Sequence, residues 1–369
     1  MKKILLMSHK FFPTKGGTQT LVLNFGRHLV KRGFEVTVYT SATANRANEE
    51  WLEGIHVVRF SRQNAIPRPW YVTLGMMAKP IWAEYDLLHS FSIITFQCLY
   101  AATASKLSRV PLVINPEYHP WWGFYERTIG TWEMNTADRL VAQCAQERSA
   151  LLRFKSSERV VEIPPGIDRQ TYSHLPDPKE FRQKHGIEED SEVVLYVGSL
   201  SYQKGVPRLI AAMPRVVAQH PKARLVLVGR GGISGVGQEQ TRSFGTTIRI
   251  IDDASDEELI QAYALADLFV FPSVSESFGI ALLEAAAAGL PIVSTPVGVA
   301  EELVIDGVTG FKVNPSSQDL AARIVEALNS EELKENARNQ RNKVLAAYDW
   351  EKVTDSLANL YNGLITPRN

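Results

Sequence analysis

The chain has 369 residues, of which 45% are hydrophobic and 22% are charged. This composition is that of an ordinary globular protein, and the length is enough for two domains with full cores. No run approaches the roughly 18 to 20 apolar residues that a membrane-spanning helix needs, so we expect no such helix.

The formal net charge of zero hides an uneven distribution. Residues 1–169 carry 21 Lys and Arg against 14 Asp and Glu, whereas the remaining residues carry 19 against 26. This split indicates that the first half meets something anionic, although uneven solvated surface charge would look the same. The two cysteines, Cys98 and Cys144, have neither disulfide nor zinc spacing, which fits a reducing cytoplasm.

The first half reads as alternating strands and helices. The apolar run at residues 4–7 is too short for the core of a signal peptide and is better explained as a first buried strand. Short apolar runs separated by helices are typical of a parallel sheet that is covered on both faces. We expect strands at 3–7, 35–40, 55–60, 87–91, 112–115, 139–142 and 160–163, and helices at 17–32, 95–107 and 125–136.

The alternation restarts after a break near Pro164-Pro165-Gly166 and a polar stretch that runs to Pro178. Further strands are expected at 193–197, 224–228, 248–251, 268–271 and 292–295, with helices at 206–219, 256–264, 279–288 and 350–364. We therefore predict an α/β fold of two doubly wound domains. Ligands of such sheets bind outside the carboxyl ends of the strands, so two facing domains would share one deep cleft.

The segment 272–291, PSVSESFGIALLEAAAAGLP, is the most informative part of the chain. It places Glu276 and Glu284 on either side of a helix start at Ser277, Phe278 and Gly279. A carboxylate inside an apolar helix is unfavourable unless it is hydrogen-bonded, and a helix N-terminus attracts anions. The segment predicts a ligand with phosphate in its middle and hydroxyl groups at both ends.

Two other loops have features that suit a phosphate. Gly16 and Gly17 lie just before a helix, where the backbone can approach a ligand closely, although a tight turn explains them equally well. In GSLSYQKGV, Gly198 ends a strand and Lys204 precedes another helix. Lys204 suits a diphosphate at that place, and the alternative is an exposed lysine.

Two further patterns point away from other functions. Gly229 and Gly231 resemble the start of a dinucleotide fingerprint, but Ser234 stands where the third glycine would be, which argues against a nicotinamide cofactor. Asp252, Asp253 and Asp256 could suggest a metal cluster. Asp256 is better explained as the acidic start of a helix, so no essential metal is expected.

The first half has its own candidate site after the strand at 112–115. Glu117 and His119 would lie at the carboxyl end of that strand, where either a structural or a functional histidine is possible. The aromatic and basic stretches at 68–82 and 119–128 suit an anionic bilayer surface. They could equally form core or line an acceptor pocket.

These motifs together make the chain resemble the family 4 retaining glycosyltransferases of the GT-B type (glycosyl transferases group 1). The similarity runs nearly end to end, from FFPTKGGTQTLVLNFGRHLVKRGFEVTVYT through ADRLVAQCAQE, EIPPGIDRQTY and VGSLSYQKGVPRLI. It ends on DLFVFPSVSESFGIALLEAAAAGLPIVSTPVGVAEELVIDGVTGFKVNP, which carries the family's two-glutamate signature, Glu276 and Glu284 with seven residues between them.

The resemblance implies an N-terminal acceptor domain at 1–169, a donor domain at 170–345 and a C-terminal helix at 346–369 that returns to the first domain. Glu276 would contact hydroxyls of the donor sugar, and Glu284 the nucleotide ribose. The implied donor-binding residues are Gly17, Gly198, Ser199, Lys204, Glu276, Ser277, Phe278, Gly279, Ile280 and Glu284, and the catalytic candidates are Glu276, Lys204, His119 and Glu117.

Two positions depart from the family's usual pattern. Ser199 stands where an arginine is common, so the diphosphate lacks one cationic partner and depends more on Lys204. Glu117 stands where many members have a histidine, so either His119 takes over contact with the sugar or Glu117 has a changed role.

The expected activity is transfer of a sugar, with retention of anomeric configuration, from a nucleoside diphosphate sugar to an acceptor hydroxyl. A cell-surface polysaccharide, lipopolysaccharide or glycolipid would be the product. The expected partners are the donor and a glycan or lipid-linked acceptor, with an anionic membrane surface as a further candidate and no nucleic acid. The expected location is the cytoplasm or the inner face of the plasma membrane. Other readings are a phosphorylase-like or hydrolysing enzyme, and a catalytically weak nucleotide-sugar-binding subunit that partners another glycosyltransferase.

Overall fold

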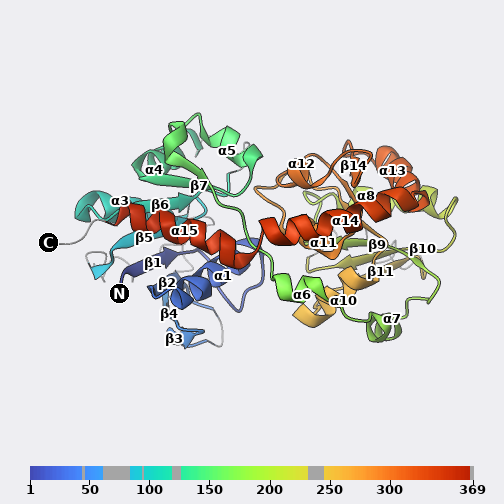
Figure 1. The fold of residues 1–369 in the computed structure, drawn as a ribbon, viewed down its shortest axis with the longest axis horizontal. Coiled ribbons are helices and arrows are strands. Elements are labelled where there is room, and N and C mark those ends of the chain that lie inside the picture. Colours follow the sequence, from blue (N-terminus) through green and yellow to red (C-terminus); the bar gives the residue numbers. More distant parts are fainter. Residues whose placement is uncertain (44–45, 61–83, 94, 119–125, 232–244, 366–369) are drawn as a thin grey trace. The chain divides into compact units, whose positions relative to one another are not determined.

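The computed structural model describes residues 1–43, 46–60, 84–93, 95–118, 126–231 and 245–365. The chain divides into two compact units (Figure 1). The first contains Met1–Gly166 and Trp350–Asn369, and the second contains Ile167–Asp349. Within the described residues, no helix is both long and apolar enough to cross a membrane.

The first unit is built on an eight-stranded sheet in the order β3-β4-β2-β1-β5-β6-β7-β8. Its strands are β1 (Lys3–Met7), β2 (Glu35–Ser41), β3 (Glu49–Leu52), β4 (Ile55–Phe60), β5 (Leu87–Phe91), β6 (Leu112–Asn115), β7 (Arg139–Ala142) and β8 (Val160–Glu162). The parallel pairing predicted from the sequence is confirmed for seven of them. The short edge strand β3, which was not predicted, runs antiparallel to β4.

Helices cover both faces of this sheet. They are α1 (Gly17–Lys31), α3 (Phe96–Ser108), α4 (Thr131–Thr136), α5 (Ala145–Leu151) and α15 (Trp350–Leu364). One core cluster joins α1, α15 and the sheet, and a second joins α3, α4 and the opposite face. The helical stretch expected at 125–136 is confirmed over residues 126–136, where a π-helical turn, Glu126–Gly130, runs into the short α4.

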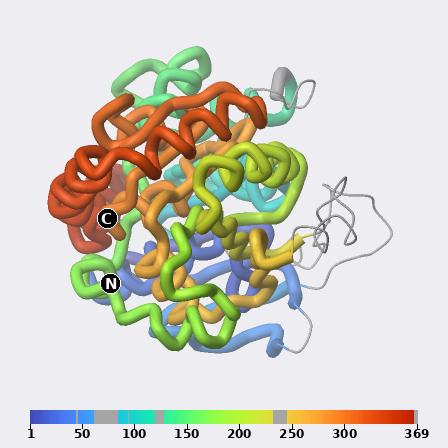
Figure 2. Tube along the Cα trace, turned by 90° about the vertical axis from the view of Figure 1, so that its right-hand side faces the viewer, coloured from blue at the N-terminus to red at the C-terminus, as the bar shows by residue number. Residues whose placement is uncertain are grey.

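The C-terminal helix α15 is an integral part of the first unit. Tyr361 on α15 is buried, and its hydroxyl bonds to the ring of His89 on β5. His89 also bonds to Asn115 Oδ1 at 2.7 Å, and burial lowers its pKa to about 3. Near the start of β1, Lys2 Nζ donates to Asn362 Oδ1 at 2.6 Å, and the two segments lie side by side in Figures 1 and 2.

The second unit contains a six-stranded parallel sheet in the order β11-β10-β9-β12-β13-β14. Its strands are β9 (Glu192–Val197), β10 (Ala223–Val228), β11 (Ile248–Ile251), β12 (Leu268–Phe271), β13 (Ile292–Ser294) and β14 (Gly310–Lys312). Runs such as VVLYV and LFVF are fully apolar because helices bury both faces of the sheet.

One face of this sheet carries α8 (Val206–Val217) and α13 (Ser317–Asn329), which pack against each other (Figure 1). The other face carries α10 (Asp256–Leu265), α11 (Ile280–Ala288) and α14 (Glu331–Ala347). The short helices α6 (Arg169–Ser173), α7 (Lys179–His185) and α12 (Ala300–Leu303) complete the unit. The sequence did not lead us to expect α5, α6, α7, α12, α13, α14 or β14.

Candidate functional site

The carboxyl ends of β9 and β12 are the topological switch point of the second sheet. The chain runs from β9 through β10 to β11 at one edge, and then continues on the other side of β9 with β12, β13 and β14. The loops that follow β9 and β12 therefore leave in opposite directions. In doubly wound sheets this divergence opens the crevice in which ligands bind.

Backbone contacts fix the two loops against each other. The amide of Val274 donates to the carbonyl of Gln203 at 3.0 Å. Gly205 has a φ of 73°, and a Cβ at this position would lie 2.0 Å from the carbonyl oxygen of Pro272. Only glycine fits both this conformation and this approach. The loop that carries Lys204 is thus held tightly against the loop that carries Glu276.

Lys204 and Glu276 form an ion pair across these loops. Lys204 Nζ lies 2.6 Å from Glu276 Oε1, and the side chains are 31% and 10% exposed. The preceding residues Gly198 and Ser199 follow β9 directly, and the carbonyl of Ser199 accepts a hydrogen bond from the Tyr196 hydroxyl at 2.9 Å. The structure therefore brings the predicted lysine and the first predicted glutamate into contact.

The start of α11 follows Glu276 at once. Gly279 is the N-cap residue in the left-handed conformation (φ 91°, ψ 68°), and no side chain caps the helix. Phe278 is buried, and its carbonyl accepts from the Val299 amide at 2.8 Å. The first N–H groups of a helix have no partner within the helix and lie at its positive end, so this terminus suits an anionic group beside Lys204.

Glu284 lies one turn into α11 and is partly buried. Its Oε2 accepts a hydrogen bond from the hydroxyl of Tyr263 on α10 at 2.8 Å. Burial raises the pKa of Glu284 to about 7, and the charge of Asp256 acts in the same direction, while the Tyr263 hydrogen bond opposes them. Burial therefore disfavours the ionised form of Glu284 unless a hydrogen-bond donor or a positive charge compensates it.

The first unit has a second carboxylate site at its own switch point. The chain runs from β1 to β2 and β4 on one side, and later from β5 to β8 on the other. Glu117, which follows β6 and has a φ of 51°, accepts from Thr18 Oγ1 at 2.6 Å and from Ser92 Oγ. Thr18 lies in the first turn of α1, directly after Gly17, and Ser92 follows β5. Three segments far apart in the sequence thus meet at one carboxylate.

A second buried carboxylate, Glu147 on α5, lies behind Glu117. The backbone amides of Tyr118 and Gln143 donate to it at 2.8 and 2.7 Å. Burial raises its pKa to about 8, and the charge of Glu117 adds to this effect. Burial also raises the pKa of Glu117, against the hydrogen bonds from Ser92 and Thr18. Sequence reasoning missed Glu147, Thr18 and Ser92, because nothing in their local sequences marks them.

The predicted residues fall into two groups by unit. Gly17 and Glu117 belong to the first unit, and the second contains Gly198, Ser199, Lys204, Glu276, Ser277, Phe278, Gly279, Ile280 and Glu284. His119 and the aromatic stretch at 68–82 lie outside the described residues. In the part of the chain that the structure describes, no three His, Cys, Asp or Glu side chains gather as metal ligands would.

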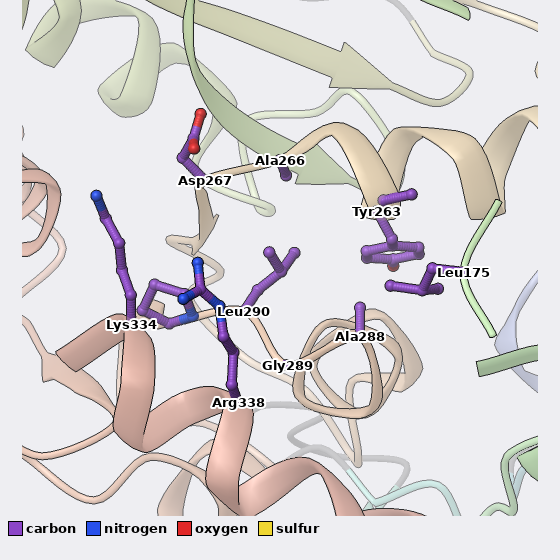
Figure 3. A pocket seen from close by; sticks show the side chains of 11 residues that line it. Leu175, Tyr263, Ala266, Asp267, Ala288, Gly289, Leu290, Lys334 and Arg338 are labelled. Atoms are coloured by element: carbon purple, nitrogen blue, oxygen red, sulfur yellow. The ribbon is translucent and has the colours of Figure 1, made fainter. Parts of the chain in front are cut away.

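A cavity of about 170 Å³ lies elsewhere in the second unit (Figure 3). Asp267 and Gly289, which border it, are at the amino end of β12 and after the last turn of α11, away from Lys204 and Glu276. Lys334 and Arg338 of α14 extend toward it in Figure 3, where Tyr263 and Leu175 form the opposite wall. Tyr263 therefore lines this cavity and also donates the hydrogen bond to Glu284.

The two doubly wound units and the phosphate-compatible helix start define a GT-B fold, as in solved glycosyltransferases. HepE of Anabaena, whose structures contain UDP with glucose or UDP-glucose, is 22% identical, and the similarity covers 98% of this chain and 100% of that one, with TM-scores of 0.79 and 0.78.

The sequence comparison identifies the family. Residues 15–171 match Glycosyltransferase Family 4, and residues 177–344 match Glycosyl transferases group 1. Together the two matches show that the chain belongs to the family 4 (group 1) glycosyltransferases. The D-inositol 3-phosphate glycosyltransferase of Geodermatophilus obscurus is 28% identical, over 94% of this chain and 84% of its own length. The gpi3 subunit of a phosphatidylinositol N-acetylglucosaminyltransferase from Schizosaccharomyces pombe is 23% identical, over 99% and 81%.

Proposed function

We propose that the protein transfers a sugar from a nucleoside diphosphate sugar to an acceptor hydroxyl with retention of anomeric configuration. The carrying observation is the arrangement at the start of α11, where Lys204 pairs with Glu276 and the helix terminus follows Glu276 and precedes Glu284 in the chain. The diphosphate binds at the helix start and Lys204, the sugar at Glu276, and the ribose at Glu284. UDP complexes of a protein with the same fold support this assignment.

In the proposed reaction, the bond between the anomeric carbon and the diphosphate oxygen breaks, and the diphosphate leaves with the electron pair. The acceptor oxygen forms its bond to the same face of the anomeric carbon, and its proton passes to the leaving phosphate. Lys204 and the dipole of α11 stabilise the negative charge that develops on the diphosphate.

Product stereochemistry tests the retaining assignment. The products formed from an α-linked donor are analysed by NMR during the first turnovers, before any exchange of configuration. We expect an α-linked product, and a β-linked product would reject retention while leaving glycosyl transfer intact.

We assign acceptor binding to the first unit, with Glu117 as the residue that contacts the reacting groups. Its carboxylate is already oriented by Thr18 and Ser92, which supports a precise role. Glu117→Gln preserves the size of the side chain and removes its charge, and we expect it to lower kcat about a hundredfold with little change in donor affinity.

Glu53→Gln on the same unit is the matched control, because Glu53 forms only a 3.8 Å surface pair with Arg27. Steady-state kinetics with varied donor and acceptor would measure both variants. If the Glu117 variant has the kcat of the wild type, Glu117 takes no part in the reaction.

An anionic membrane surface is the partner we propose for a basic patch on the first unit, consistent with a lipid-linked acceptor in cell-surface glycan synthesis. The patch contains Lys106, Arg139, Lys155 and Arg159. Burial lowers the pKa of Lys155, and the three neighbouring cations add to this effect, which supports their proximity. Leu107, beside Lys106, is 72% exposed, so the patch combines charge with an apolar side chain.

Co-sedimentation with phosphatidylglycerol vesicles tests this partner. We expect binding that falls by about thirtyfold when Lys106 and Arg159 are both replaced by alanine. Lys222→Ala, which removes an exposed cation from the second unit, serves as the control. Equal binding to neutral phosphatidylcholine vesicles would contradict the proposal.

The gpi3 relative favours one alternative, a nucleotide-sugar-binding subunit that needs a partner for activity. Ser199 and Glu117, which depart from the family pattern, also support it. Donor binding by the purified chain without transfer to any acceptor, and activity that appears only with a partner, would favour this alternative.

A further inference from the structure

Tyr263 is a fully buried tyrosine of α10 whose position is fixed on several sides. Its hydroxyl donates to Glu284 Oε2 at 2.8 Å and lies 3.4 Å from the carbonyl oxygen of Ala281. Its ring lies 6.2 Å from that of Tyr172 and 5.9 Å from that of Phe269. The same ring forms part of the cavity wall in Figure 3. Packing therefore determines where the hydroxyl points.

The local sequence explains why α10 can hold this side chain in register. Ser255 and Glu258 form a capping box at the start of α10, which fixes the first turn. Ala262 precedes Tyr263 and is also buried, and β12 begins soon after the helix ends. The hydroxyl is thus carried by a helix with a defined start, and not by a loop.

We propose that Tyr263 is a positioning residue that holds Glu284 in the orientation and charge state that the ribose hydroxyls of a nucleotide require. This inference rests on the ribose role of Glu284 in the proposed function. The tyrosine hydroxyl has one proton to donate, and it donates this proton's hydrogen bond to Glu284 Oε2. Oε1 is then the oxygen directed to the ligand. Two ribose hydroxyls are donors, so they bind an ionised carboxylate better than a protonated one.

Two titratable groups shift the pKa of Glu284 from the elements packed against α11. Burial raises this pKa, the Tyr263 hydrogen bond from α10 lowers it, and the charge of Asp256, also on α10, raises it. On α6, burial raises the pKa of Tyr172, and the charge of Glu284 adds to that effect. On α12, Glu301 is paired with Lys312, and on α14, Arg341 donates to the carbonyls of Ala287 and Tyr172. Among these groups, Tyr263 is the one that hydrogen-bonds the Glu284 carboxylate. Because this bond lowers the pKa of Glu284, removal of the Tyr263 hydroxyl should raise that pKa.

The test is the pH dependence of UDP binding in Tyr263→Phe, measured by calorimetry between pH 5.5 and 9.5. In the wild-type protein, the affinity should fall as the pH drops through about 7, where Glu284 takes up a proton. Loss of a hydrogen bond that favours the ionised form should move this fall to higher pH by about one pH unit. At pH 7 the variant should then bind UDP severalfold more weakly than the wild type.

Tyr172→Phe is the matched control, because it removes another buried hydroxyl beside the same carboxylate. We expect its midpoint to stay at the wild-type value. A Tyr263→Phe midpoint equal to that of the wild type, including the case of a uniform loss of affinity at every pH, would overturn the positioning role. Circular dichroism of each variant verifies that it is folded.

The 2′,3′-dideoxy analogue of UDP separates this inference from the proposed function. Preference of the wild-type protein for UDP over the analogue supports the ribose contact, and an unmoved midpoint would then overturn the role of Tyr263 alone. Equal binding of UDP and the analogue would overturn both. GDP and ADP with their dideoxy analogues replace UDP if UDP does not bind.

Discussion

Replacement of Lys204 by alanine is expected to lower kcat by roughly two to three orders of magnitude, because it removes a charge that faces the leaving diphosphate. The diphosphate becomes more negative as the glycosidic bond breaks, so the lysine stabilises the transition state more than the bound donor. KM for the donor should therefore change less than kcat. Initial rates over a range of donor concentrations would separate the two effects.

Lys312→Ala is the matched control for this variant. Lys312 belongs to the same unit and forms a comparable ion pair with Glu301 at 2.8 Å, with the lysine side chain 29% exposed. It lies on β14, at the edge of the sheet and away from the switch point. An equal loss of kcat in both variants would show that the loss does not come from the proposed phosphate contact.

Replacement of Glu284 by alanine is expected to weaken nucleotide binding by at least about a hundredfold. The proposed contact provides hydrogen bonds from two ribose hydroxyls to a charged acceptor, each worth about 1.5–3 kcal/mol when the carboxylate is ionised. Calorimetry at pH 8, above the pKa of Glu284, measures the full effect. Glu326→Ala, which removes an exposed carboxylate paired with Arg323, should bind as the wild type does. Unchanged affinity in the Glu284 variant would reject its ribose role.

The same carboxylate should lower the stability of the free protein. Its folded pKa of about 7 lies above the ordinary glutamate value of 4.5, so the folded state holds the proton more tightly than the unfolded state. The contribution to stability is therefore largest below pH 4.5 and is lost as the pH rises toward 7. By linkage the loss is at most about 3 kcal/mol above pH 7. A residue that costs stability in the free protein is consistent with one kept for a ligand.

Much of the second unit could be predicted from its sequence. The run LFVF predicted β12, and the apolar helix that follows predicted α11, because local periodicity and glycine positions act within a few residues. Glu276 and Glu284, with seven residues between them, were visible in the same segment. The contact between Lys204 and Glu276 was not predicted, since it depends on β9 and β12 being neighbours in the sheet.

Contacts between distant segments could not be predicted in the same way. The edge strand β3 was missed because its sequence, EEWL, is short and has no run of apolar residues longer than two. Tyr263 looked like one apolar residue among others in α10, and Ser92 and Thr18 had no pattern that linked them to Glu117. These partners are separated by 21 to 99 residues from the carboxylates that they bind. No local rule of periodicity or capping reaches across such separations.

The sequence alone determined the α/β architecture, and it predicted the break near Pro164 and the candidate donor segment from Glu276 to Glu284, because each depends on patterns within one or two turns or strands. The tertiary structure decided which groups surround each carboxylate. Glu284 obtains its raised pKa and its tyrosine partner from helices packed on α11, and Glu117 obtains two hydroxyl partners from other strand ends. Charge state and orientation follow from desolvation and packing, which only the folded chain creates.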